Sequence, residues 1–65
     1  MFRLEIFDWE GGTLRKHVKH YDSFMSAYDA LTVHSHRKTI TNMKIYDPDN
    51  DLIHVHNDSM PDTYA

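Results

Sequence analysis

The chain has no cysteine, only two glycines and two prolines, and no long apolar run in its 65 residues. Without cysteine it has no disulfide, no thiolate metal site and no thiol nucleophile. No apolar run approaches the roughly 18 residues needed to span a bilayer, and no signal-peptide pattern opens the chain. The lack of cysteine also fits a reducing compartment. We therefore expect one soluble, cytoplasmic domain with no membrane partner.

The chain also lacks any block of like charge. Its formal net charge is −3, and it has six histidines, which make the charge sensitive to pH between about 5.5 and 7.5. From residue 47 onward there are five aspartates and neither lysine nor arginine. No basic segment is long enough to act as a nucleic-acid arm, so the charge distribution disfavours a nucleic-acid partner.

The first 21 residues predict a β-hairpin. Apolar and polar residues alternate from residue 2 to residue 9, which is the period of a strand. Gly11-Gly12 then indicates a turn, after which the chain can run back as a second strand. A three-residue loop would place Leu4 opposite Val18, whereas a two-residue loop would place Leu4 opposite Lys19. The first arrangement keeps apolar residues together, so we predict the three-residue loop.

A second hairpin is predicted near the C-terminus. Thr41, Met43 and Ile45 form one face of its first strand, and pairing Ile45 with Ile53 places Ile53 and Val55 on the same face. This pairing leaves Pro48-Asp49-Asn50 as a three-residue loop. Proline suits the first turn position and asparagine suits a left-handed one, so the loop chemistry agrees with the register.

A helix is predicted between the hairpins. Asp22 or Ser23 caps it, and it runs to about His36. Four side chains recur at helical spacing and are expected to pack on the sheet: Phe24, Ala27, Tyr28 and Leu31. The fold class is therefore α+β with the order ββαββ, a four-stranded antiparallel sheet in the spatial order 2-1-3-4 and one helix on one face. Residues 1–57 form a single domain, and residues 58–65 are expected to be a flexible tail.

The sheet face away from the helix is the predicted partner-binding surface. It is expected to combine aromatic and aliphatic side chains with cations, which is typical of interface hot spots. The acidic second loop is a further contact that favours a partner with a basic groove. The predicted partner-binding residues are Phe7, Trp9, Arg15, Lys44, Tyr46, Leu52, Asp47, Asp49 and Asp51. On these registers Ile40, His17, Lys19, Tyr21, His54 and His56 also lie on this face.

Two other binding functions remain open as alternatives. Aromatic and basic side chains on one sheet face are also typical of single-stranded nucleic-acid binders, where bases stack on rings. The histidines could make a His-based metal-binding protein. However, His17 lies on the opposite edge strand from His54 and His56, about 14 Å away, which is too far to share an ion. We therefore predict no metal ligands and no cofactor.

No catalytic constellation is visible. The serines fall at the expected cap, on the helix or in the tail, and the paired carboxylates occur only in turns, where solvent keeps them near their ordinary behaviour. A chain of this length also has little room for a water-excluding pocket. We therefore expect a protein that is not an enzyme.

In size and layout the chain resembles small bacteriophage proteins that bind and disable host machinery. The stretch from His17 to Tyr46, with His20-Tyr21-Asp22-Ser23 entering the helix, is similar in arrangement to a short bacteriophage inhibitor of RNA polymerase. Anti-CRISPR proteins have the same compact, cysteine-poor character. The resemblance is one of architecture, so it implies no particular site residue. It implies a protein-binding inhibitor of a host enzyme or defence complex that acts by surface occlusion, alone or as a homodimer.

Overall fold

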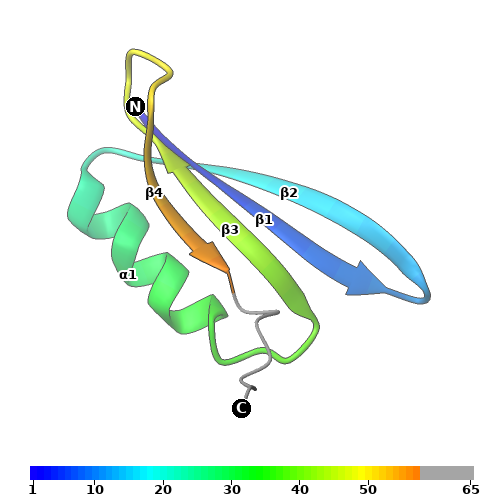
Figure 1. The fold of residues 1–65 in the computed structure, drawn as a ribbon. Helices are drawn as coiled ribbons and strands as arrows, with labels where there is room; N and C mark the ends of the chain where they lie inside the picture. Colours follow the sequence, from blue (N-terminus) through cyan, green and yellow to red (C-terminus); the bar gives the residue numbers. More distant parts are fainter. Residues whose placement is uncertain (58–65) are drawn as a thin grey trace.

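The computed structural model describes residues 1–57 as one antiparallel sheet with one helix packed against it. The sheet order is β2-β1-β3-β4, and every neighbouring pair is antiparallel, so the predicted fold class and strand order are confirmed. Figure 1 shows the β1–β2 hairpin reaching past the end of the helix. The elements are β1 (Phe2–Glu10), β2 (Thr13–Tyr21), α1 (Phe24–His34), β3 (Ile40–Tyr46) and β4 (Leu52–Asn57).

Helix α1 begins at a serine cap, as predicted. The Ser23 hydroxyl accepts a hydrogen bond from the backbone N–H of Ser26 at 3.2 Å, which satisfies one of the free amides of the first turn. At the other end, the Ser35 N–H donates to the Leu31 carbonyl at 2.9 Å. The helix ends at His34, two residues earlier than expected.

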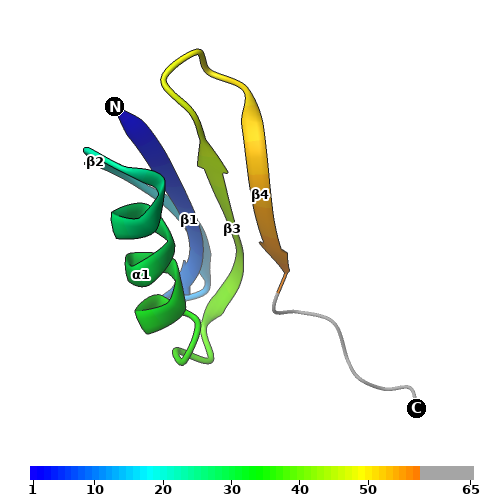
Figure 2. The ribbon, with the colours of Figure 1, turned by 90° about the vertical axis from the view of Figure 1, so that its left-hand side faces the viewer.

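The core lies between α1 and one face of the sheet. Ala27 and Leu31 of α1 are buried there, and Phe24 packs at the edge of the same cluster. Figure 2 shows α1 on the side of β1 and β3, with β4 on the far side of β3 from β1. The strands contribute five buried side chains to this cluster: Leu4, Ile6, Ile40, Met43 and Ile45.

The register of the first hairpin differs from the prediction. Leu4 pairs with Lys19 rather than Val18, so the loop has the two residues Gly11 and Gly12, with φ values of +60° and +83°. Such a turn has the twist of the flanking strands. The prediction avoided charge opposite core residues, but β2 is an edge strand whose residues from Thr13 to His20 are all exposed. Charged side chains there keep their contact with water, so the pairing carries little desolvation cost.

The second hairpin has the predicted loop but not the predicted pairing. The Asp47 N–H donates to the Asp51 carbonyl at 2.9 Å, and Asn50 has a left-handed φ of 70°. A bulge follows, so that Ile45 pairs with His54 instead of Ile53. His54 and His56 therefore lie on the helix side of the sheet, and Ile53 and Val55 lie on the other side. The His54 ring packs against the rings of Tyr28 at 5.2 Å and Phe24 at 6.4 Å between centroids, which explains this choice of face.

A third correction concerns the start of β3. Ile40 was expected on the open side of the sheet, but it pairs with Asp8 and is buried in the core. A shift in register between Phe7 and Asp8 makes this possible, with Asn42 paired to Phe7 and Thr41 as the extra residue. The Thr41 hydroxyl donates to the Phe7 carbonyl at 3.2 Å.

β4 ends at Asn57, the last described residue, so the domain boundary predicted there stays a prediction. The predicted flexible tail, residues 58–65, lies outside the described residues. In the part of the chain that the structure describes, no helix has the length and the apolar run that crossing a membrane requires.

Candidate functional site

The sheet has one face without a helix in residues 1–57, and we call it the open face. Its members follow from the strand pairing, because paired residues in a sheet project to the same side and neighbours along a strand alternate. The described residues on the open face are Arg3, Glu5, Phe7 and Trp9 of β1, Leu14, Lys16, Val18 and His20 of β2, Asn42, Lys44 and Tyr46 of β3, and Leu52, Ile53, Val55 and Asn57 of β4.

The open face is more apolar than the sequence predicted. The corrected registers bring Leu14 and Val18 onto it from β2, and Ile53 and Val55 from β4. Together with Trp9 and Leu52, these side chains are between 43% and 51% exposed. Isolated exposed apolar residues are ordinary, but this set is spread over three strands of one face, β1, β2 and β4.

The cations of the open face lie against its aromatic rings. The Arg3 guanidinium carbon lies 4.2 Å from the centre of the Tyr46 ring, and the Lys44 ammonium lies 5.7 Å from the centre of the Phe7 ring. Arg3 also donates to Glu5 at 3.0 Å. The open face has three cations (Arg3, Lys16 and Lys44) against the single carboxylate of Glu5, so its formal charge is +2 with histidine neutral. It is positive although the whole chain is negative.

Five of the nine predicted partner-binding residues share the open face: Phe7, Trp9, Lys44, Tyr46 and Leu52. Arg15 does not, because the corrected register pairs it with Asp8 and turns it to the helix side, where it lies 3.7 Å from Glu10. The same correction moves His17, Lys19 and Tyr21 off the open face.

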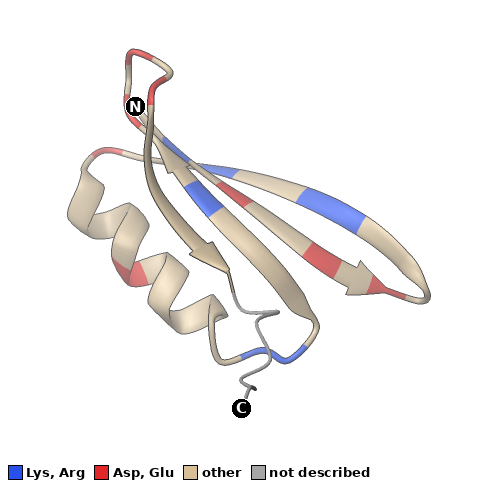
Figure 3. Cartoon of the chain, viewed as in Figure 1, with Lys and Arg blue, Asp and Glu red and all other residues tan. Residues whose placement is uncertain are grey.

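The three predicted aspartates lie in the β3–β4 loop, at one end of the sheet (Figure 3). Asp47 is used within the turn, since its Oδ1 accepts hydrogen bonds from the backbone N–H groups of Asp49 at 3.0 Å and Asp51 at 2.9 Å. Asp49 and Asp51 are exposed. This loop and the β1–β2 turn stand at opposite ends of the molecule (Figure 1).

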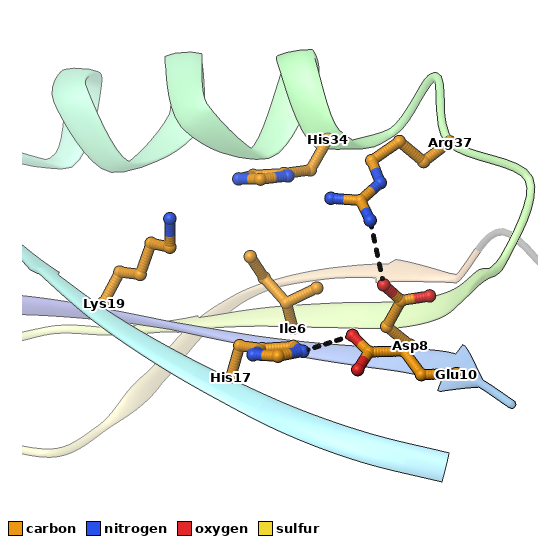
Figure 4. Close-up of a pocket in the computed structure, with 7 residues that line it drawn as sticks. All are labelled: Ile6, Asp8, Glu10, His17, Lys19, His34 and Arg37. Atoms are coloured by element: carbon orange, nitrogen blue, oxygen red, sulfur yellow. Dashed lines mark hydrogen bonds and ion pairs between the residues drawn. The ribbon is translucent and has the colours of Figure 1, made fainter. Parts of the chain in front are cut away.

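A pocket of about 270 Å³ lies on the helix side of the sheet, between the end of α1 and the β1–β2 hairpin. It is lined by Ile6, Asp8, Glu10, His17, Lys19, His34 and Arg37 (Figure 4). One possible ligand atom from each of Asp8, Glu10 and His17 lies within 4.8 Å of the other two. None of these three side chains was predicted to be a metal ligand.

The polar groups of the pocket are unequally paired. Nε2 of His17 lies 2.7 Å from Glu10 Oε2, and Arg37 donates to Asp8 Oδ2 at 3.3 Å. Asp8 is only 2% exposed, and its Oδ1 has no hydrogen-bond partner. Burial and the nearby cations of Lys19 and Arg37 lower the pKa of His34, against the opposing effect of Asp8.

The sequence did contain a signal for this cluster. Gly11-Gly12 is typical of a two-residue hairpin turn, and that turn alone places Glu10 opposite Thr13 and Ile6 opposite His17. Asp8, Glu10 and His17 then share one face. The predicted three-residue loop, chosen to keep apolar residues opposite one another, instead put His17 on the other face of the sheet from the two acids.

Comparisons with protein-family models, with curated proteins and with solved structures found no match to this chain.

Proposed function

We propose that this chain is a non-enzymatic protein-binding module that docks through its open face. It would act as a small bacteriophage inhibitor does, by covering the functional surface of a host enzyme or defence complex in the cytoplasm. The observation that carries the proposal is the set of half-exposed apolar side chains on β1, β2 and β4, on a face that no other described element covers.

The size of the open face suits a protein partner. Strands of six to nine residues at the usual spacing make a face of roughly 500 Å² in projection. A standard protein–protein interface buries about 800 Å² per partner. The open face can therefore supply most of such an interface.

The charge of the open face favours a partner other than a second copy. Each copy presents three cations and one carboxylate, so a face-to-face homodimer would bring together two faces of the same positive charge. An apolar surface rimmed by acidic groups is complementary to it. The exposed Asp49 and Asp51, at the end of the sheet, would meet a basic region of the same partner.

A protein partner is also favoured over a single-stranded nucleic acid. Nucleic-acid binders stack bases on free ring faces. On the open face, Arg3 already lies over Tyr46 and Lys44 lies near Phe7, and Arg3 is neutralised by Glu5. A base would have to displace these cations from the rings.

The test compares two variants in affinity capture from bacterial lysate. Trp9→Ser with Tyr46→Ser alters the open face, and Met25→Ser with Val33→Ser removes apolar side chains that are 64% and 68% exposed on α1. We expect a specific partner to be retained by the wild type and the α1 variant and lost by the open-face variant, with circular dichroism unchanged in all three.

The supporting measurements separate the alternatives. Sedimentation of the isolated chain should show a monomer, and fluorescence anisotropy with single-stranded oligonucleotides at low salt should show no binding. Partner capture that survives the change at Trp9 and Tyr46 would exclude the open face as the docking site. Tight oligonucleotide binding would replace the proposal with the nucleic-acid alternative.

A further inference from the structure

We propose that Asp8, Glu10 and His17 form a binding site for a divalent transition-metal ion, with zinc as the first candidate. The three side chains come from adjacent strands, β1 and β2, next to the Gly11-Gly12 turn. They offer one imidazole nitrogen and two carboxylate oxygens, all within 4.8 Å of one another. This proposal is independent of the proposed function, because the site lies on the opposite side of the sheet.

The geometry is close to that of a coordinated ion. Ligand atoms that each lie about 2 Å from one ion are about 3.5 Å apart. The side chains would therefore have to move on the order of 1 Å to coordinate the ion together. Two of the three side chains can make it, since Glu10 is 39% and His17 is 44% exposed. Three protein ligands would leave a fourth position open to water, and the pocket of about 270 Å³ in front of them has room for it.

Asp8 provides the independent observation that a ligand is missing. A carboxylate removed from water is normally paired at both oxygens. Asp8 is 2% exposed, its Oδ1 has no partner, and its Oδ2 has one long hydrogen bond from Arg37 at 3.3 Å. A divalent cation would supply the charge that this buried group lacks.

The donor set selects the class of metal. Magnesium and calcium prefer sites made of oxygen alone, whereas an imidazole nitrogen favours zinc and its neighbours in the first transition row. The two carboxylates offset the charge of a divalent ion. Arg37 is the competitor for Asp8, since it approaches the carboxylate from the helix side (Figure 4).

Zinc binding should be measured on the full chain by competition with a chromophoric chelator at pH 7.5. We expect one zinc ion per chain for the wild type. Glu10→Gln and His17→Gln each remove a ligand from an exposed position and should weaken binding at least tenfold without loss of fold. His20→Gln is the matched control, because His20 lies on the same strand but projects to the open face. It should bind as the wild type does.

The variant Arg37→Gln distinguishes zinc bound at Asp8 from zinc bound by histidines elsewhere on the surface. Removing the competing cation should strengthen zinc binding several-fold, because Asp8 is then free to coordinate. Absence of zinc binding to the wild type would overturn the proposal. So would an affinity that is unchanged by His17→Gln, or one that is lost in His20→Gln, since zinc would then be held elsewhere on this histidine-rich chain.

Discussion

At the scale of the residue, Asp8 combines deep burial with poor pairing. Its neighbours along β1 on the same face include Ile6, and its partner on β3 is the buried Ile40. An apolar side chain would fit this environment better, because a buried charge is costly unless both oxygens are satisfied. A residue that lowers stability in such a place is expected to serve another purpose.

We predict that Asp8→Val raises the free energy of unfolding by about 1 kcal/mol, because it removes a poorly paired buried carboxylate. Arg37 would lose its partner, but its side chain is 56% exposed and water can solvate it. Asp8→Asn keeps a buried polar group and should be the less stable of the two variants. Urea denaturation measures both. A loss of more than about 1 kcal/mol in Asp8→Val would mean that the pair with Arg37 stabilises the fold.

His34 should titrate below its ordinary range. Partial burial, Lys19 and Arg37, with a smaller effect from His17, lower its pKa from 6.5, while Asp8 acts in the opposite direction. The folded chain therefore resists protonation more than the unfolded chain does. The contribution of His34 to stability is present above pH 6.5 and is lost as the pH falls from 6.5 through the lower pKa of the folded state. An NMR titration of the His34 ring in metal-free buffer should give a midpoint below 6.5, and a midpoint at or above it contradicts this.

At the scale of the element, the strands, the helix cap and the second loop could be predicted from the sequence. The registers between strands could not. The strands, the Ser23 cap and the Pro48-Asp49-Asn50 loop each follow from a few neighbouring residues. The register errors arose from a rule that apolar residues pair with apolar residues. That rule fails at edge strands, where Lys19 opposite Leu4 still reaches water, and at bulges, where one extra residue reverses the face of His54.

The candidate site was predicted only in part for the same reason. Phe7 and Trp9 lie on β1, which pairs with β2 without a register shift, and Tyr46 follows the buried Ile45, so simple alternation along each strand placed them correctly on the open face. The position of His17 beside Asp8 depended on the turn between β1 and β2. The bulge that buries Ile40 depended on a pairing between β1 and β3 that no local pattern encodes.

The two glycines of the first turn should not be equally replaceable. Gly12 has a φ of +83° and Gly11 a φ of +60°, and a Cβ at either position would meet no atom within 4 Å. Any cost is therefore one of backbone strain. We expect Gly12→Ala to lower the free energy of unfolding by about 1 kcal/mol, and Gly11→Asn to change it by less than about 0.5 kcal/mol, because asparagine tolerates the left-handed region. Equal stability of Gly12→Ala and the wild type in urea would show that the hairpin adopts another turn.

At the scale of the whole molecule, the two faces of the sheet differ in burial. One face holds the core residues beneath α1, and the other holds the half-exposed apolar set. The helix side also contains the pocket, at the end where the β1–β2 hairpin extends beyond α1 (Figure 1). A chain of 65 residues has little stability in reserve, on the order of 3–5 kcal/mol. Substitutions on the helix side and on the open face should therefore differ sharply in their effect on the free energy of unfolding.

We predict that replacing Leu14, Val18 and Val55 together by threonine changes the free energy of unfolding by less than about 1 kcal/mol, since each is about half exposed and threonine keeps the strand preference. The same variant should lose the captured partner. Ile45→Ala, at a position that is fully buried, should cost about 3 kcal/mol and leave the chain close to unfolding at 25 °C. Urea denaturation and affinity capture on the same preparations test both statements. If the triple variant unfolds instead, the open face is part of the core of the isolated chain and cannot be a free docking surface.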